Sequence, residues 1–386
     1  MARPRILHIS ADFPDAWSAR KTPAVRNLLD GSPELDHRVY SINRVNGFGG
    51  ITAQDRSDRV TTLVYRAPPY GILLRPFLNR LADWIAADIK AQGLRVDLVH
   101  GHKLTIEGLV ARRVARHLGC PYVCTVRGNT DQKYLRLKPG LHAAWRRVAA
   151  EAAWLFPVTP WIERYLVETL SLPDAPRSLL PTITKIDHFL PPRDTGPGLV
   201  TAFHLAGWKL KGMPNLLSAI AALRDQGCTI TLDIIGSDAG SAEAALAREI
   251  ARHGLTGQVT LRGAVPHADM PKTLNGYAAF VLPTLRETFG MVYLEALFAG
   301  VPILYSQDRG IDGFFDDQGI GLRCDPTSVA SITEALRALH GDTGQMKHAV
   351  ARLQQSGGLE RFRAGPVCQG YSARVQAIAK GPGSGP

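Results

Sequence analysis

The chain has 386 residues, of which 20% are charged and 45% hydrophobic, and its formal net charge is +11. This composition is typical of a globular protein and excludes a disordered or transmembrane chain. No apolar run approaches the roughly 20 residues that a membrane-spanning helix needs. The N-terminus enters a strand-like run directly, without the apolar core of a signal peptide, so we expect a cytoplasmic protein.

The first half of the chain alternates strand-like and helix-like stretches. Strands are expected at 5–10, 38–42, 59–65, 97–100, 122–126 and 154–158, and helices at 22–30, 76–92, 106–118, 141–150 and 161–170. Such alternation predicts a parallel sheet covered by helices on both faces, with ligands at the carboxyl ends of the strands.

The run 191–198 is rich in Pro and Gly and reads as an interdomain linker. A second α/β set follows, with strands at 199–204, 229–235, 259–262, 278–283 and 302–305 and helices at 213–225, 241–253, 271–274, after 290, 328–340 and 346–355. We therefore expect a first domain over 1–190 and a second over 199–360. A helix over 361–380 could pack back on the first domain, and 381–386 is a flexible tail.

Five cysteines are present, an odd number without a Cys-x-x-Cys pair: Cys120, Cys124, Cys228, Cys324 and Cys368. This pattern indicates neither a disulfide framework nor a zinc site, and we expect small buried side chains. No pair of aspartates around a single residue occurs that could hold a diphosphate through a divalent ion. We expect no metal and no other cofactor.

The stretch 285–302 carries two carboxylates, Glu287 and Glu295, eight residues apart. If a helix begins near Gly290, the free amides of Gly290, Met291 and Val292 form a positive end that attracts phosphate. A buried Glu295 could accept hydrogen bonds from a ribose diol, and Glu287 could meet the group that follows the phosphates. Two solvated glutamates on an ordinary helix are the alternative.

The residues around these glutamates resemble the signature of the family-4 glycosyltransferases, also called glycosyl transferases group 1. The matching positions are Pro283, Thr284, Glu287, Phe289, Gly290, Met291, Glu295, Ala296, Phe298, Ala299, Gly300, Val301 and Pro302. The resemblance implies the B-type fold, in which two doubly wound Rossmann-like domains of class α/β face each other across a cleft. It also implies retaining transfer of a sugar from a nucleoside-diphosphate sugar to a saccharide or lipid-linked acceptor.

The resemblance implies further donor-binding residues. Lys211, followed by Gly212, matches a lysine that holds the donor phosphates, but Ala206 or Leu205 stands where the family has an arginine. Lys209 is the nearest substitute cation. The stretch Gly263, Ala264 and Val265 resembles the one whose backbone pairs with the nucleotide base, and Phe289 belongs to the signature.

In the first domain, His102 and Arg127 each follow a strand and should open on the ligand edge of the sheet. The family usually has a histidine where this chain has Arg127, so we expect Arg127 to contact phosphate or carboxylate instead of acting as a base. We group Glu287, Arg127 and His102 as catalytic, although a structural role for His102 is an alternative. Arg20 and Lys21 replace a family Gly-Gly pair and could meet an anionic acceptor.

Positive charge gathers in the first half, in 75–80, 133–138 and 145–147, interleaved with Phe77, Leu78 and Trp145. This arrangement suits peripheral contact with an anionic membrane, and a merely basic protein is the alternative. No nucleic-acid-binding motif is present. We expect a hexosyltransferase in cell-surface polysaccharide or glycolipid biosynthesis. A sugar-nucleotide epimerase of the same fold and a non-catalytic sugar-nucleotide-binding protein are the rival hypotheses.

Overall fold

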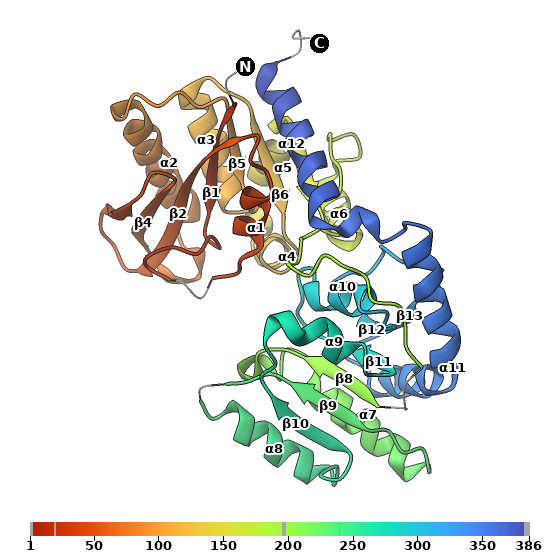
Figure 1. Ribbon diagram of the computed structural model, residues 1–386. Coiled ribbons are helices and arrows are strands. Elements are labelled where there is room, and N and C mark those ends of the chain that lie inside the picture. The colour runs from red at the N-terminus through yellow and green to blue at the C-terminus, as the bar shows by residue number, and fades with distance from the viewer. Residues whose placement is uncertain (1–2, 19–20, 195–197, 239, 382–386) are drawn as a thin grey trace. The chain divides into compact units, whose positions relative to one another are not determined.

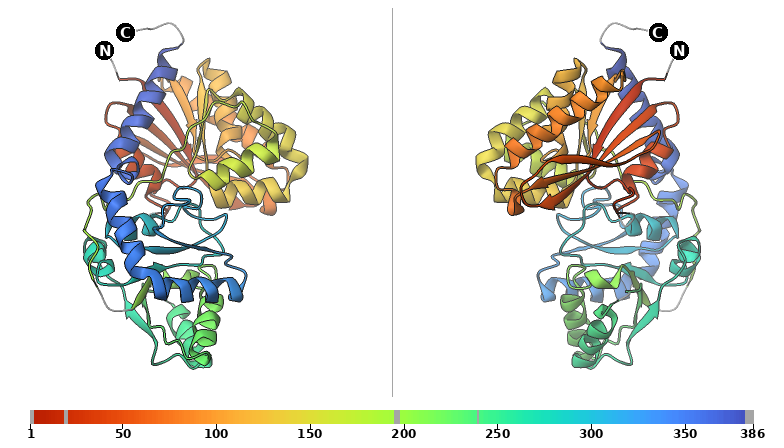
Figure 2. Two further views of the ribbon diagram at one scale, coloured as in Figure 1. Left: turned by 90° about the vertical axis from the view of Figure 1, so that its right-hand side faces the viewer. Right: turned by 90° about the vertical axis from the view of Figure 1, so that its left-hand side faces the viewer.

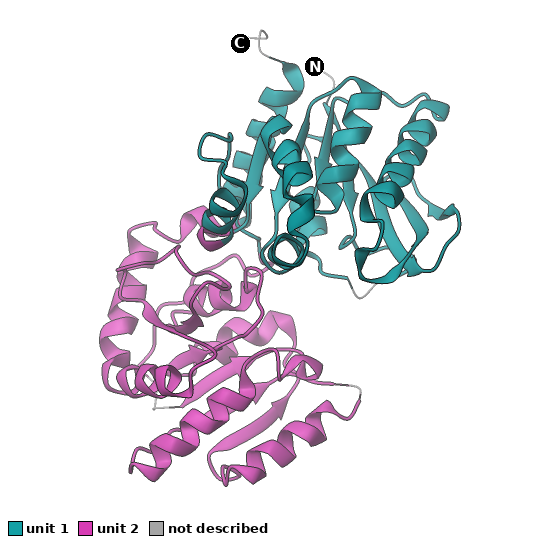
Figure 3. Cartoon of the chain, turned by 180° about the vertical axis from the view of Figure 1, so that it is seen from behind, with its two compact units in different colours: residues 1–158, 162–183, 364–386 teal, residues 159–161, 184–363 magenta. Residues whose placement is uncertain are grey.

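The computed structural model describes residues 3–18, 21–194, 198–238 and 240–381. The chain divides into two compact units, shown in Figure 3. Unit 1 comprises 1–158, 162–183 and 364–386, and unit 2 comprises 159–161 and 184–363. The chain therefore passes into unit 2 after residue 183, earlier than the expected boundary at 190, and residues 191–194 belong to unit 2. Residues 195–197 of the expected linker and 382–386 of the expected tail lie outside the described part.

Unit 1 is built on a seven-stranded sheet of order β3-β4-β2-β1-β5-β6-β7. Its strands are β1 (Arg5–Ser10), β2 (Asp36–Asn46), β3 (Ile51–Arg56), β4 (Val60–Ala67), β5 (Leu98–Gly101), β6 (Tyr122–Val126) and β7 (Trp154–Pro157). All neighbours pair in parallel except β3, which is antiparallel to β4 at one edge. The chain order reverses between β1 and β5, which makes the carboxyl ends of these two strands the switch point of the sheet.

Helices cover both faces of the first sheet (Figures 1 and 2). On one face α1 (Ala24–Asp30) and α12 (Ala364–Lys380) share a buried cluster with the strands, to which α12 contributes Val367, Cys368, Tyr371 and Val375. On the other face lie α2 (Leu74–Ala91), α3 (Glu107–Leu118) and α5 (His142–Glu151). The last segment of the chain thus completes the core of unit 1. The remaining helices are α4 (Gly128–Leu137) and α6 (Pro160–Leu170).

Unit 2 carries a six-stranded, wholly parallel sheet of order β10-β9-β8-β11-β12-β13. Its strands are β8 (Leu199–Ala202), β9 (Leu232–Ile235), β10 (Val259–Gly263), β11 (Ala279–Val281), β12 (Ile303–Ser306) and β13 (Gly321–Cys324). The helices are α7 (Met213–Asp225), α8 (Ala242–Arg252), α9 (Met270–Leu274), α10 (Met291–Phe298) and α11 (Val329–Gln355). The order reverses between β8 and β11, so a ligand is expected where these strands end.

Helix α11 corrects one expectation, because a single helix replaces the two predicted over 328–340 and 346–355. Gly341 and Gly344 lie in its middle, yet neither adopts a positive φ. Ile332, Leu336 and Val350 are buried along one side of α11, and this continuous apolar contact outweighs the low helix propensity of glycine.

Several apolar side chains that we expected on a basic surface are in the core. Leu78, Leu135 and Trp145 are each 1% exposed or less, and Trp145 Nε1 donates a hydrogen bond to the Thr105 carbonyl at 2.9 Å. Cys124, Cys324 and Cys368 are buried as expected, whereas Cys120 and Cys228 are partly exposed, and all five cysteines are free. In the described part of the chain, no helix is both long and apolar enough to cross a membrane.

Candidate functional site

Lys211 and Glu287 meet at the switch point of unit 2. Lys211 lies in the connection between β8 and α7, Glu287 lies between β11 and α10, and Lys211 Nζ is 2.5 Å from Glu287 Oε2. The two connections are in close contact, because a Cβ on Gly212 would lie 1.9 Å from the Pro283 carbonyl oxygen. Gly212 is also the N-cap of α7 with a φ of 77°. Only glycine fits this approach, which places the lysine beside the carboxylate.

The connection after β11 ends at α10, whose N-cap is Gly290 with a φ of 79°. Met291 and Val292 form the partly exposed first turn, and Phe289 is 2% exposed with its ring edge-on to Phe314. The first amides of a helix have no partner within the helix, so this end is positive and offers N–H donors. The N-terminus of α10 can thus bind a phosphate group beside the Lys211–Glu287 pair.

Glu295 is in the second turn of α10 and is 7% exposed. Its Oε1 accepts a hydrogen bond of 2.6 Å from Thr184 Oγ1 and lies 3.2 Å from His267 Nε2. Thr184 begins the main segment of unit 2, and His267 follows β10. Three separate segments therefore orient one carboxylate. Thr184 and His267 were missed by sequence reasoning, since neither the Thr182–Asp187 stretch nor a lone histidine stands out without the fold.

The remaining expected donor residues occupy loops of unit 2. Gly263 ends β10 with a φ of 74°, Ala264 is exposed and Val265 is half-buried. Lys209 is exposed and its Nζ lies 5.4 Å from the centre of the Trp208 ring. Leu205, where a family arginine would be near, is buried in a short 3₁₀ turn. Among the described residues, Lys211 is thus the cation that reaches Glu287.

In unit 1, His102 follows β5 and Arg127 follows β6, and both side chains are buried, at 1% and 9% exposure. Within the described part of the chain, His102 Nδ1 and Arg127 Nε have no hydrogen-bond partner. Burial lowers the pKa of Arg127 despite the nearby carboxylates of Asp12, Glu107 and Asp131. A buried guanidinium nitrogen without a partner is costly, so a ligand or water is expected beside it.

The expected acceptor-binding pair is described only in part, because Arg20 lies outside the described residues. Lys21 Nζ lies 3.0 Å from both Asp15 Oδ2 and Ser41 Oγ. Nearby, Lys103 Nζ lies 2.7 Å from Asp12 Oδ1. Burial opposes ionisation of Asp12, but Lys103 and then Arg127 and Lys21 bring its pKa below the ordinary value. Asp12 and Asp15, both in the loop after β1, are thus each paired with a lysine.

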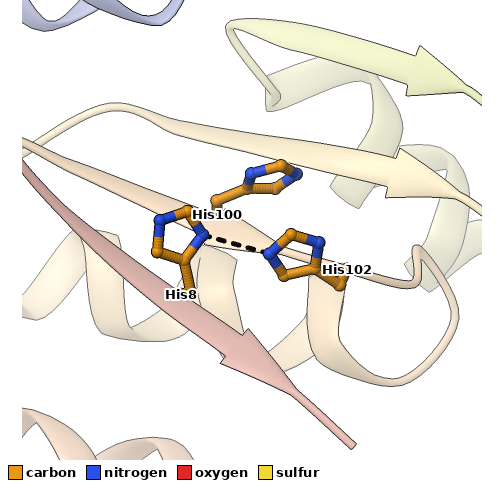
Figure 4. Close-up of side chains that lie close together, drawn as sticks. All are labelled: His8, His100 and His102. Carbon is orange, nitrogen blue, oxygen red and sulfur yellow. Dashed lines mark hydrogen bonds between the residues drawn. The ribbon is translucent and has the colours of Figure 1, made fainter. Parts of the chain in front are cut away.

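His102 is part of a group of buried histidines at the switch point of unit 1 (Figure 4). His102 Nε2 lies 3.0 Å from His8 Nδ1, and His8 Nε2 lies 2.9 Å from His37 Nδ1. His100 stacks on His102 with ring centres 4.0 Å apart. Burial is the main reason why the pKa of each of these four histidines is lowered, so they are neutral at pH 7.

Two family models match this chain and together span most of it. The model for a glycosyl transferase 4-like domain matches residues 22–182, and the model for glycosyl transferases group 1 matches residues 197–354. The chain belongs to the family-4-like group 1 glycosyltransferases. The family expected from the sequence is confirmed, and the chain is an enzyme of the hexosyltransferase type that uses a nucleotide sugar.

Two curated relatives illustrate the range of this glycosyltransferase family. A D-inositol 3-phosphate glycosyltransferase from Arthrobacter sp. (strain FB24) is 28% identical over 302 residues, which are 73% of this chain and 71% of the relative. A putative teichuronic acid biosynthesis glycosyltransferase from Bacillus subtilis is 26% identical over 283 residues, covering 70% of this chain and 68% of the relative.

Solved structures share the fold of this glycosyltransferase. Sucrose-phosphate synthase from Thermosynechococcus elongatus superimposes with a TM-score of 0.71 at 18% identity, covering 97% of this chain and 98% of that one. Anabaena HepE in complex with UDP gives a TM-score of 0.65 at 14% identity, with coverage of 97% and 99%. The expected B-type fold with two Rossmann-like domains is confirmed.

Proposed function

We propose that unit 2 binds a nucleoside-diphosphate sugar at the edge formed by β8, β11 and the start of α10, and that the sugar is transferred with retention to a saccharide or lipid-linked acceptor. The observation that carries the proposal is the meeting of Lys211, Glu287 and the N-terminus of α10 at the switch point of the sheet. A cation, a carboxylate and free amides at one edge fit a diphosphate followed by a sugar.

Each residue has a role in this proposal. Glu295, held by Thr184 and His267, accepts hydrogen bonds from the ribose hydroxyls. Lys211, the amides of Gly290, Met291 and Val292, and the outer cation Lys209 hold the diphosphate. The backbone of Gly263, Ala264 and Val265 contacts the base beside Phe289. Glu287 accepts hydrogen bonds from hydroxyls of the transferred sugar.

In the transfer, the bond between the anomeric carbon and the diphosphate oxygen breaks, and that oxygen keeps the electron pair. The acceptor oxygen forms the new bond to the anomeric carbon, and its proton passes to the leaving diphosphate oxygen. Lys211 and the α10 amides stabilise the negative charge that grows on the leaving diphosphate. Arg127 and His102 of unit 1 are the catalytic groups proposed for the acceptor and sugar hydroxyls, and Arg20 and Lys21 are proposed to contact the acceptor. No metal is assigned a part in this scheme.

We also propose that the enzyme works in cell-surface polysaccharide or glycolipid synthesis, at the cytoplasmic face of an anionic membrane. The support lies in unit 1, where Tyr70, Ile72 and Leu73 are 87%, 55% and 57% exposed. Tyr70 and Leu137 line a cavity of about 260 Å³ together with Lys133, Tyr134 and Lys138. Exposed apolar side chains beside lysines suit the interface of an anionic bilayer.

A panel of UDP-, GDP- and ADP-sugars, incubated with the enzyme and analysed by mass spectrometry, tests the proposal. Transfer predicts free nucleoside diphosphate and a product that forms only with acceptor. An epimerised donor would favour the epimerase hypothesis, and an unchanged donor that still binds would favour a non-catalytic sugar-nucleotide-binding protein.

A further inference from the structure

Three histidines of unit 1 form a continuous chain of hydrogen bonds that ends on a backbone carbonyl. His37 Nε2 lies 2.8 Å from the Ser32 carbonyl oxygen, His37 Nδ1 lies 2.9 Å from His8 Nε2, and His8 Nδ1 lies 3.0 Å from His102 Nε2. All three rings are at most 4% exposed. The chain runs from β2 through β1 to the residue after β5.

The carbonyl at one end fixes every proton in this chain. A carbonyl oxygen can only accept, so His37 carries its proton on Nε2 and a neutral His37 has a bare Nδ1. His8 must then donate from Nε2, which leaves His8 Nδ1 as an acceptor. His102 must donate from Nε2 in turn, and its Nδ1 is left without a proton.

This deduction requires neutral rings, and the surroundings favour them. Burial removes the three imidazole rings from water and so lowers their pKa. The positive charges of Arg59, Lys103 and Arg127 also oppose protonation of these rings. Asp36 and Asp30 act in the opposite sense on His37 alone, without restoring its ordinary pKa.

His102 Nδ1 and Arg127 Nε are complementary groups, since the first is a bare acceptor and the second carries a hydrogen. Both are buried and lack a partner among the described residues. They follow adjacent strands, because β5 pairs with β6, and Arg127 is close enough to lower the pKa of His102. A hydroxyl group can donate to one and accept from the other.

We propose that His37 and His8 are positioning residues that fix the tautomer of His102, so that His102 Nδ1 and Arg127 Nε–H together bind one hydroxyl group of the carbohydrate substrate. The identity of that hydroxyl rests on the proposed function, but the tautomer does not. The chain of imidazoles supplies an acceptor that a lone histidine, free to exchange tautomers, would supply only part of the time.

A metal ion is the other ligand that three buried histidines suggest, since ligand atoms of His8, His100 and His102 lie within 4.8 Å of one another. The ring orientations argue against it. His100 and His102 are stacked at an interplanar angle of 28°, so their in-plane lone pairs run side by side and do not converge. Both nitrogens of His100 also lie 2.8 Å from hydroxyls, those of Tyr371 and Thr125.

The test is long-range proton–nitrogen NMR on the full chain with ¹⁵N-labelled histidine at pH 7.5, which distinguishes protonated from bare ring nitrogens. We expect His37, His8 and His102 all to carry the proton on Nε2. A proton on His102 Nδ1, a charged ring, or a change of these signals to those of ligated nitrogens on adding zinc would overturn the proposal. This readout does not depend on whether sugar transfer is detected.

Variants of His37 then test its effect on the substrate. His37→Phe removes the anchor, and we expect mixed tautomers at His102 and a rise in the acceptor KM or a fall in kcat of roughly tenfold, the size of one lost hydrogen bond. The dissociation constant of the nucleoside diphosphate, whose proposed binding residues all belong to unit 2, should not change.

His37→Gln keeps an amide N–H for the Ser32 carbonyl and an oxygen for His8, so it should preserve the wild-type tautomer and kinetics even if His37→Phe folds poorly. His117→Phe, on the surface of the same unit, is the matched control. Unchanged kinetics in His37→Phe with an altered tautomer would show that the chain of imidazoles has no part in substrate binding.

Discussion

Lys211 Nζ and Glu287 Oε2 lie 2.5 Å apart, although 76 residues separate them along the chain. The pair joins the connections after β8 and β11, so the cation proposed for the phosphates is held by the carboxylate proposed for the sugar. Because both groups are only partly buried, a ligand can replace either side of the pair with its own charge.

Replacing Lys211 by Met should weaken nucleoside-diphosphate binding by about tenfold to a hundredfold, because one charge-assisted contact to the phosphates is lost. Calorimetry with the nucleoside diphosphate and with the bare nucleoside measures it, and the nucleoside should bind as before. Lys272→Met, exposed on α9, is the control. Lys209→Met tests the substitute cation. It should weaken nucleoside-diphosphate binding less than Lys211→Met, because Lys209 is exposed and takes no part in the Lys211–Glu287 pair. Equal losses for nucleoside and diphosphate would contradict the role of Lys211.

Replacing Glu295 by Ala should raise the dissociation constant of the nucleotide by about tenfold or more, since a buried ionised acceptor for the ribose disappears. Thr184→Val should produce part of this loss, because Glu295 would lose the hydroxyl that orients it. A 2′,3′-dideoxynucleotide should not distinguish the variants from wild type. Glu334→Gln, on the exposed side of α11, provides the comparison, and an unaltered constant in Glu295→Ala would refute the assignment.

Activity should survive an excess of EDTA. The charge on the leaving diphosphate is met in our scheme by Lys211 and the α10 amides, and the sequence has no pair of aspartates around a single residue for a divalent ion. Initial rates are compared before and after dialysis against EDTA. Loss of activity that manganese or magnesium restores would show that the diphosphate is held in another way.

Stability should fall as the pH is lowered from about 7 towards 5. The pKa of His100 is lowered to about 3, and those of His8 and His102 are also well below 6.5, chiefly through burial. The unfolded chain therefore binds protons that the native state does not bind. The free energy of unfolding then falls by up to about 1.4 kcal/mol per pH unit for each histidine. The contribution of these histidines to the free energy of unfolding is fully present above the pKa of a histidine in the unfolded chain and is lost as the pH falls below that pKa.

Thermal unfolding at pH 7.5, 6.0 and 5.0 measures this dependence. Burial raises the pKa of Glu107 and so acts in the opposite sense, which is why the comparison uses a variant. His100→Gln keeps an amide for Thr125 and Tyr371 and should reduce the slope, and His348→Gln, exposed on α11, provides the comparison. Parallel slopes for wild type and His100→Gln would exclude His100 as a source of the dependence.

Anionic liposomes should bind the enzyme, and high salt should release it, because basic side chains near an anionic surface contribute about 1 kcal/mol each and salt screens them. We expect Ile72→Ser with Leu73→Ser, or Lys133→Ser with Lys138→Ser, to reduce co-sedimentation. Leu210→Ser and Lys272→Ser, which change an exposed leucine and an exposed lysine of unit 2, are the matched controls. Equal and negligible pelleting of all proteins with neutral and anionic lipid would contradict the membrane proposal.

The sequence was most informative where apolar periodicity is strong. The strands at 5–10 and 122–126 have the expected bounds because each is a short run that is buried on both faces, and the helix at 213–225 does because its buried residues repeat at helix spacing. Helix α4 was not predicted, since Leu135 is its only large apolar residue in the core and Asp131 organises its start through Arg127 and Thr105. Strand β3 is a half-exposed edge strand without a regular pattern, and it too was missed.

Candidate site residues could be predicted where they stand close together in a sequence motif, and could not be predicted where only the fold brings them together. Glu287, Glu295 and the glycine at 290 stand in one stretch of sequence, so the sequence alone suggests that they lie near one another. Thr184 lies 111 residues from Glu295, and His8, His37 and His102 come from three separate segments. Only the register of the strands brings such residues together, and no local pattern reports it.

The return of the chain to unit 1 bears on how the protein folds during synthesis. Strands β1 to β7 leave the ribosome first, but Val367, Cys368, Tyr371 and Val375 of α12, which cover one face of their sheet, follow only after all of unit 2. Until then, α1 covers part of this face, but the part that Tyr371 covers beside His100 and Phe156 is exposed. Unit 2 can therefore finish folding before unit 1, which reverses the usual N-to-C order. The intermediate in which the first sheet lacks α12 exposes apolar surface, and a nascent chain in this state would need a chaperone.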